Sequence, residues 1–227
     1  MIVRTRRMGG SSGQPGFEVF APMEQGVRLW ATLWEAGSPL GVVAIGNGVS
    51  ALGARLEAGL AARSTELVSG YDLVEAGLGG PAKAADFVGK AAYLEQLARP
   101  PAALLCQLAV DDERSPSTGE LRFPLGGEPV LTRAGELLVD ARGRRSFVTS
   151  AGSVPTIGRH LLFAYLPPEH AAVGAPLAVE CFGERYPATV IAVGATRPDG
   201  AGGETGASGV PAVAWSRAGE PGTGAAG

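Results

Sequence analysis

The chain has 227 residues and a formal net charge of −3 at pH 7, and 45% of its residues are hydrophobic. This hydrophobic content excludes a chain that is disordered throughout, although 35 Gly and 17 Pro place it near the edge of globular composition. The charge excludes the electrostatic footprint of a protein that binds nucleic acid or anionic membranes. No stretch approaches the roughly 18 consecutive apolar residues of a membrane span. From the charge and from this lack of a span together, we expect neither nucleic acid nor a membrane as a partner.

The first part of the chain, about 95 residues, is predicted to be an α/β segment. Trp30 and Trp34 recur at helical spacing before Gly37, which is typical of a helix end. Asp86 precedes another periodic segment as a plausible N-cap. In chain order, the spacing predicts a helix over 24–35, a strand over 40–45, a helix over 49–62 that ends as helix or strand, and a helix over 86–97.

From residue 102 onward the pattern changes to short strands. Runs rich in β-branched and aromatic residues alternate with turns at roughly 8–12-residue spacing, which is typical of a small antiparallel barrel or sandwich. The predicted strands cover 104–110, 128–132, 136–140, 145–150, 161–166, 176–182 and 184–193. The segment 195–227 is dominated by Gly, Ala, Pro and Ser and has no periodicity, so we expect a disordered tail.

A glycine motif suggests a dinucleotide site, but its context does not support one. Gly46 to Ala51 fits the pattern G-x-G-x-x-A, and Glu66 follows at the distance of a ribose-binding acid. That fold needs further strand–helix–strand units, whereas this chain continues into strands alone. Glu66 also lies inside a candidate strand over 65–68. We therefore favour glycines in a strand-to-helix turn.

Cysteine and histidine offer no catalytic or metal site by sequence. His160 and His170 have no partner that sequence spacing justifies, and both are expected in solvent-exposed loops. Cys106 and Cys181 lie in apolar runs, which favours buried free thiols and a reducing, cytoplasmic location. We assign no catalytic residue and no metal ligand.

Several phrases in order resemble the glycine cleavage T-protein (aminomethyltransferase) family. Within the family, they most resemble the C-terminal folate domains of dimethylglycine and sarcosine dehydrogenases and oxidases. The matching phrases are GFEVFAP (16–22), LWATLWEAG (29–37), ARLEAGL (54–60), DLVEAGLG (72–79), DFVGKAAYLEQL (86–97), PLGGEPV (124–130), FVTSAGSVPTIGRHLLFAYLPPE (147–169) and ECFGERYPATV (180–190).

The resemblance implies an α+β fold in three parts. These are the C-terminal portion of a folate-binding domain over 1–98, a small antiparallel β-barrel over 99–194 and a disordered tail over 195–227. It also implies tetrahydrofolate-dependent transfer of a one-carbon unit from an amine donor. Within this family a Glu in the G-F-E phrase binds the pterin, which corresponds to Glu18, and an Arg before the LEAG phrase binds the folate tail, which corresponds to Arg55.

The chain departs from the family pattern mainly in its folate-site phrases. The family's N-terminal half has no counterpart here, and residues 63–66 replace a common aromatic-Gly-x-Asp pattern. Two functions therefore stay open. One is a partial transferase that works with a separately encoded N-terminal half or a flavin-dependent amine dehydrogenase chain. The other is a non-catalytic relative used for assembly or folate binding. With either function, the loss of the N-terminal half would expose strand edges and apolar surface of the folate-binding domain. We therefore expect an oligomer or a complex.

Overall fold

The computed structural model describes residues 1–5, 16–46, 48–82, 84–155 and 157–195. Helices dominate the first half and an antiparallel sheet the second, which confirms the α+β prediction. The helical elements are η1 Met23–Gln25, α1 Gly26–Gly37, η2 Ser38–Leu40, the π-helix η3 Val49–Ala54, α2 Arg55–Glu57, α3 Lys90–Ala98 and η4 Pro168–His170. The strands are β1 Ile2–Thr5, β2 Gly16–Val19, β3 Leu104–Val110, β4 Val130–Thr132, β5 Val148–Val154, β6 Arg159–Leu166, β7 Pro176–Cys181 and β8 Glu184–Val193.

The helices form where apolar periodicity predicts them, but glycines set their ends. α1 confirms the helix expected over 24–35. The helix expected over 49–62 ends at Glu57, because Gly59 takes a left-handed φ of 67° and the Leu60 N–H donates to the Arg55 carbonyl at 2.9 Å. Asp86 is not an N-cap: α3 begins only after Gly89, whose φ is 88°.

Two of the predicted strands are wrong. Leu40 ends η2, and residues 41–45 follow it as irregular, exposed chain that pairs with no other strand in the described part. In 65–68, the N–H groups of Glu66 and Leu67 both donate to the Ala62 carbonyl, which makes a turn. Short apolar runs become strands only when a neighbouring strand accepts their backbone hydrogen bonds.

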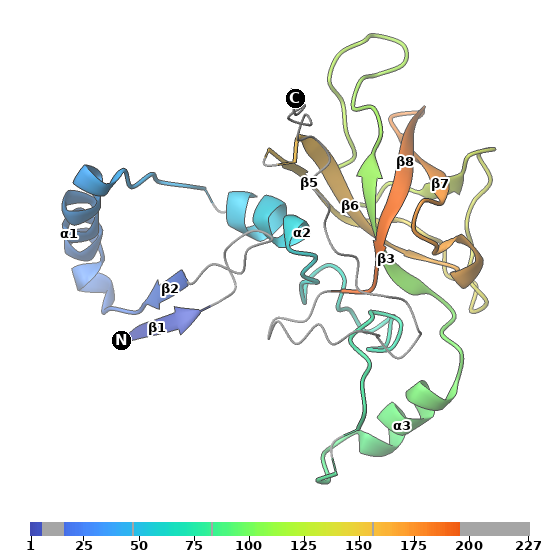
Figure 1. Ribbon diagram of the computed structural model, residues 1–227, viewed down its shortest axis with the longest axis horizontal. Coiled ribbons are helices and arrows are strands. Elements are labelled where there is room, and N and C mark those ends of the chain that lie inside the picture. Colours follow the sequence, from blue (N-terminus) through green and yellow to red (C-terminus); the bar gives the residue numbers. More distant parts are fainter. Residues whose placement is uncertain (6–15, 47, 83, 156, 196–227) are drawn as a thin grey trace, which may run out of the picture.

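The second half forms a closed antiparallel barrel (Figure 1). Its strands follow the order β4-β7-β8-β3-β6-β5. The two ends of this sheet are joined by backbone bonds, since the Val130 N–H donates to Ser146 at 3.1 Å and the Val148 N–H to Glu128 at 2.8 Å. Closure removes exposed strand edges. The run expected over 136–140 contributes isolated bridges but no ladder.

The barrel buries apolar side chains on both faces of its central strands. Along β3, Cys106 and Leu108 point into the barrel interior, while Leu105 and Ala109 point outward and are equally buried. Such two-sided burial explains why β3 and β6 lack alternation in sequence. The interior also holds Tyr186, which is 0% exposed.

The outer face of β3 and β6 is covered by chain from the first half. Leu56, Leu67, Tyr71 and Ala76 pack against it and form a second core. Backbone bonds fix this cover, because the Leu105 N–H donates to the Glu75 carbonyl at 2.8 Å. The first segment and the barrel therefore share a core, and the boundary at 98/99 stays a prediction.

The end of β8 passes closely over the covering segment. A Cβ on Gly77, whose φ is 74°, would lie 2.4 Å from the Gly194 Cα. The Ala195 N–H donates to the Ala76 carbonyl at 2.9 Å, so Ala195 belongs to the fold and not to the predicted tail. The remainder of that tail, 196–227, lies outside the described residues, as does Asn47 of the glycine motif.

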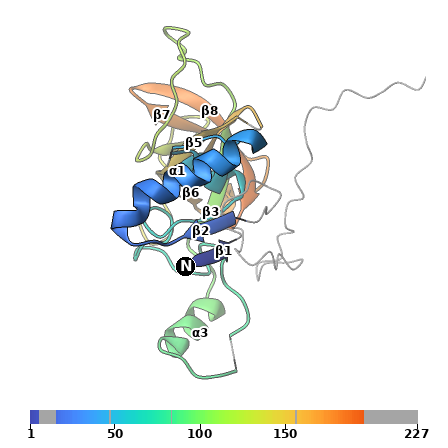
Figure 2. The ribbon, with the colours of Figure 1, turned by 90° about the vertical axis from the view of Figure 1, so that its left-hand side faces the viewer.

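α1 and the β1–β2 hairpin project from the rest of the molecule (Figures 1 and 2). Figure 2, in which this side faces the viewer, shows α1 lying across the front. None of its residues is buried, and Trp30 and Trp34 stack at 6.0 Å with 61% and 42% of their surface exposed. An apolar helix face of this size is normally covered in a soluble protein. Among the described helices, none is long and apolar enough to cross a membrane.

The close approach at Gly77 gives a test of the shared core. Gly143 has a similar φ of 78°, but a Cβ added there would have nothing within 4 Å. We expect Gly143→Ala to lower the free energy of unfolding by about 1–2 kcal/mol through backbone strain alone. Gly77→Ala should cost a further 1–3 kcal/mol, as an order of magnitude, because the backbone of β8 must move. Denaturant unfolding measures both, and equal losses would contradict the close packing.

Candidate functional site

Glu18, the predicted pterin ligand, lies on an exposed hairpin. It sits in β2 opposite Val3 of β1, and its flanking residues Phe17 and Val19 are 65% and 39% exposed. The hairpin lies apart from α2 in Figure 1. The carboxylate of Glu18 is therefore presented to solvent on the face that it shares with its cross-strand partner Val3, whereas the flanking Phe17 and Val19 point to the opposite face of the hairpin.

Arg55, the predicted ligand of the folate tail, lies at the start of α2 against the barrel. Its side chain is only 10% exposed and its Nη1 is 2.8 Å from Glu66 Oε2. The same nitrogen donates to the Leu60 carbonyl at 3.0 Å, and the guanidinium lies 6.0 Å from the centre of the Phe163 ring. Arg55 thus holds α2 to the turn that follows it, and the structure does not bring it together with Glu18.

Glu66 is a fully buried carboxylate whose two oxygens are both occupied. Oε2 accepts from Arg55, from the Ala62 N–H at 2.9 Å and from the Thr65 hydroxyl at 2.6 Å. Oε1 accepts from the hydroxyls of Thr149 at 2.8 Å and Ser150 at 2.5 Å. This carboxylate fastens the first segment to β5, and it has no oxygen directed at a ribose.

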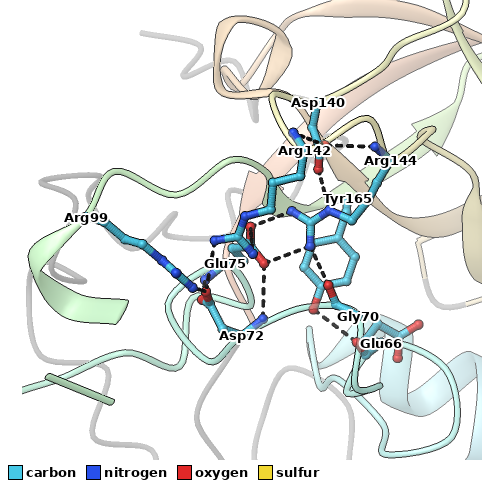
Figure 3. Close-up of polar contacts among 9 residues, drawn as sticks. All are labelled: Glu66, Gly70, Asp72, Glu75, Arg99, Asp140, Arg142, Arg144 and Tyr165. Atoms are coloured by element: carbon cyan, nitrogen blue, oxygen red, sulfur yellow. Dashed lines mark hydrogen bonds and ion pairs between the residues drawn. The ribbon is translucent and has the colours of Figure 1, made fainter. Parts of the chain in front are cut away.

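A second buried carboxylate, Glu75, lies at the centre of an arginine cluster (Figure 3). Its Oε1 is 2.5 Å from Arg144 Nη2 and its Oε2 is 3.1 Å from Arg144 Nη1, a two-point contact. Arg142 approaches the same carboxylate at 3.6 Å. Arg144 also donates to the Gly70 carbonyl and, through Nε, to Asp140 at 2.6 Å. The cluster ties the 70–75 loop to the 140–144 turn of the barrel.

Two further carboxylates complete the cluster. Burial by itself would raise the pKa of Asp72, but a hydrogen bond from the Glu75 N–H and the charge of Arg99 at 2.9 Å lower it below the ordinary value of 3.8. Burial likewise opposes the ionised form of Asp140, yet hydrogen bonds from Arg144 and Arg142 lower its pKa as well. Both groups are therefore charged at neutral pH, and neither has the raised pKa of a general acid.

An open apolar cavity of about 400 Å³ lies beside this cluster. The rings of Tyr71 and Tyr165 stack at 3.6 Å on its inner side, and the Arg144 guanidinium lies 4.3 Å from the Tyr71 ring centre. Burial raises the pKa of both phenols, so both stay protonated. The lining residues are Leu67, Val68, Tyr71, Asp72, Leu73, Phe87, Val88, Gly89, Ala92, Tyr93, Gln96 and Tyr165.

The prediction of exposed loop histidines is wrong for His160. This residue lies in β6 and is 1% exposed. Its Nδ1 is 3.0 Å from the Ser153 hydroxyl and its Nε2 is 2.7 Å from the Pro124 carbonyl. His170 is half-buried in η4. Cys106 and Cys181 are buried free thiols, as predicted. Among the described residues, no group of three or more His, Cys, Asp or Glu residues could hold a metal ion.

Sequence reasoning missed the arginine–carboxylate cluster. The available signal was Glu75 inside the otherwise apolar phrase DLVEAGLG, together with the charged run DARGRR at 140–145. A carboxylate among apolar residues is buried only when a cation pairs with it. The two segments are far apart in sequence, so nothing local connects them.

Comparison with known proteins identifies the family. The family model described as the GCVT N-terminal domain matches residues 2–85, and the one described as the glycine cleavage T-protein C-terminal barrel domain matches residues 120–193. These two models match the helical segment and the barrel in the order in which the structure shows them. The chain belongs to the glycine cleavage T-protein family.

Named relatives agree with this assignment. An aminomethyltransferase of Streptomyces coelicolor is 34% identical over 200 residues, which is 85% of this chain and 48% of that protein. An aminomethyltransferase of a Nostoc species is 31% identical over 189 residues, covering 80% and 44%. The chain thus spans about half the length of the curated relatives it matches. The crystal structure of the Bartonella henselae aminomethyltransferase T superposes with a TM-score of 0.65 over 84% of this chain and 48% of that one, at 22% identity, which shows a shared fold.

Glu75 gives a direct test of the cluster. Glu75→Gln removes one of the two carboxylates that pair with Arg144 while keeping the shape of the side chain, so Asp140 stays as the remaining carboxylate partner of the guanidinium. We expect the free energy of unfolding to fall by about 1.5–3 kcal/mol, the contribution of hydrogen bonds to a charged group. The matched control Glu136→Gln, at an exposed barrel position, should change it by less than about 0.5 kcal/mol. Similar values for the two variants in denaturant unfolding would show that the cluster does not stabilise the fold.

Proposed function

We propose that this chain takes part in tetrahydrofolate-dependent transfer of a one-carbon unit from an amine donor. The observation that carries the proposal is the succession of two T-protein family models on one chain, with the barrel and its covering segment folded together. Tetrahydrofolate would supply the nitrogen that receives the one-carbon unit. The protein's part would be to hold the pterin against the donor, since positioning supplies much of the rate in such reactions.

Glu18 is the residue we propose to hold the pterin. The 2-amino group and the N3–H of a pterin form a pair of donors, which one carboxylate accepts at two points. Glu18 is exposed on β2, and its cross-strand partner Val3, which is 38% exposed, offers apolar surface on the same face. Arg55 stays a predicted ligand of the folate tail. Its contacts to Glu66 and Leu60 mean that it would bind folate while also holding α2 in place.

A tetrahydrofolate titration of the purified chain tests Glu18. A two-point charged contact contributes about 1.5–3 kcal/mol, so Glu18→Gln should weaken binding roughly ten-fold or more. The control Glu24→Gln changes another exposed glutamate, in η1, and should leave the dissociation constant unchanged. Isothermal titration or quenching of tryptophan fluorescence provides the measurement. Equal affinities for the two variants would remove Glu18 from the site.

A non-catalytic role is the second candidate, and a specific observation favours it. Among the described residues, the buried carboxylates Glu66 and Glu75 are both paired with arginine, and their hydrogen bonds join one part of the fold to another. If saturable binding of tetrahydrofolate is absent in the titration above, the chain is a family member that keeps the scaffold for assembly.

We propose that the exposed face of α1 is covered by the part of the family fold that this chain does not match. The curated relatives are about twice as long as the matched region, and α1 presents Val27, Trp30 and Leu33 to solvent at 85%, 61% and 52% exposure. The covering part would come from a longer form of the chain, a separately encoded half or a flavin-dependent amine dehydrogenase, in a cytoplasmic complex. The free thiols Cys106 and Cys181 fit a reducing compartment.

Complementation in trans tests whether the unmatched part of the family fold binds the exposed face of α1. The region of the Streptomyces coelicolor aminomethyltransferase that this chain does not match is produced separately and titrated into the full chain. We expect a complex, a blue shift of tryptophan emission, and binding at least about ten-fold weaker for Trp30→Glu, because aromatic anchors dominate interfaces. Val173→Glu changes an apolar residue that is 52% exposed on the barrel and should have no effect. Equal binding of both variants would place the partner elsewhere.

A further inference from the structure

Ser153, His160 and the Pro124 carbonyl form a continuous polar chain that runs from the exposed serine to the buried histidine and proline. Ser153 of β5 and His160 of β6 are direct cross-strand partners, which brings the serine hydroxyl to 3.0 Å from His160 Nδ1. The Pro124 carbonyl lies 2.7 Å from Nε2 on the opposite side of the ring. A nucleophile, a base and a group that orients the base are the three parts of an activated serine. We propose that Ser153 is an activated nucleophile that accepts acyl groups from activated esters, with His160 as its general base.

The Pro124 carbonyl fixes which nitrogen of His160 carries the proton. A carbonyl oxygen only accepts hydrogen bonds, so Nε2 must donate to it and therefore bears the hydrogen. In the neutral ring this leaves the lone pair on Nδ1, which faces Ser153. The serine hydroxyl then donates to Nδ1. Its proton already points at the base that must remove it.

The surroundings of His160 keep the ring neutral and in place. The side chain is 1% exposed, and the Phe123 ring packs against it with centres 4.5 Å apart. Burial lowers the pKa of His160 below its usual 6.5, although the hydrogen bond to Pro124 and the charges of Glu113 and Glu128 act in the opposite direction. At neutral pH the imidazole is thus ready to accept a proton.

Ser153 itself is accessible, and its backbone is held firmly. The residue is exposed, whereas its partner His160 is buried. The π-helix η3 packs on the strand here, since a Cβ on Gly53 would lie 3.1 Å from the Ser153 carbonyl oxygen. The preceding residue, Gly152, is packed just as closely, because a Cβ added there would lie 3.1 Å from Leu56 Cδ1. A π-helix is rare and is often found beside functional residues.

The reaction that this arrangement supports is acyl transfer to Ser153. The serine oxygen forms a bond to the carbonyl carbon of the ester, and the hydroxyl proton passes to His160 Nδ1. When the bond between that carbon and the leaving oxygen breaks, His160 returns the proton to the departing group. The products are an acyl-serine and an alcohol, and nothing is oxidised or reduced. This site lies on the barrel and is separate from the folate function proposed above.

Acetylation by p-nitrophenyl acetate tests the proposal on the full chain. Peptide mapping by mass spectrometry should find acetyl groups on Ser153 well before any other serine, and Ser153→Ala should abolish this product. His160→Gln should slow acetylation of Ser153 by about a hundred-fold or more, which is the usual contribution of a general base. His170→Gln and Ser38→Ala are the controls and should leave the rate unchanged, since Ser38 is exposed but donates to a carbonyl.

A measurement on the unsubstituted protein guards against misfolding of the His160 variant. Nitrogen NMR of the ring should show a proton on Nε2 and none on Nδ1 at neutral pH. A proton on Nδ1 would overturn the proposal, because that nitrogen then has no lone pair for the serine. Acetylation of Ser153 at the rate of Ser38 would overturn it as well.

Discussion

The fold depends on one buried ion pair, between Glu75 and Arg144. Glu75 is 0% exposed and belongs to the segment that covers the barrel, whereas Arg144 belongs to a turn of the barrel itself. A buried charge costs several kcal/mol unless it is compensated, and this pair supplies the closest contact to each partner, with Arg142 also approaching Glu75 and Asp140 also binding Arg144. The pair also sets a register, because the Glu75 carbonyl accepts from Leu105 at the start of β3. The covering segment and the barrel are therefore packed around a shared core.

This coupling decides which polar groups are available for chemistry. Glu66 and Glu75 are buried acidic residues of the kind that serve as catalytic acids elsewhere, yet their oxygens are saturated by donors from the protein. The groups that reach solvent are on the periphery. Glu18 lies on a projecting hairpin, and Ser153 lies on the barrel beside a buried base. The interior of the unit stabilises the fold, and its surface carries the two residues for which we propose ligand binding and acyl transfer.

The projecting hairpin and α1 bury less apolar surface than the barrel does and so gain less stability from packing. No residue of α1 is buried, whereas β3 and β6 are buried on both faces. Burial of apolar surface is the main source of stability, so α1 gains little from the contacts it makes in this chain. A stacked pair such as Trp30 and Trp34 stabilises the structure more strongly when another part of the family fold covers both rings and removes them from water. That is why we propose that the part of the family fold which this chain does not match covers the exposed face of α1.

The amino-acid sequence by itself determined the elements whose patterns are local. Helical spacing predicted α1, short runs of apolar, β-branched or aromatic residues predicted β3, β6 and β8, and ordered phrases identified the family. Only the tertiary structure decided the roles of Glu66, Glu75 and His160, and it turned two apolar runs, 40–45 and 65–68, into irregular chain and a turn. The physical reason is the same in each case. Strand pairing and the neutralisation of buried polar groups depend on partners distant in the chain, and Glu75 meets Arg144 across 69 residues.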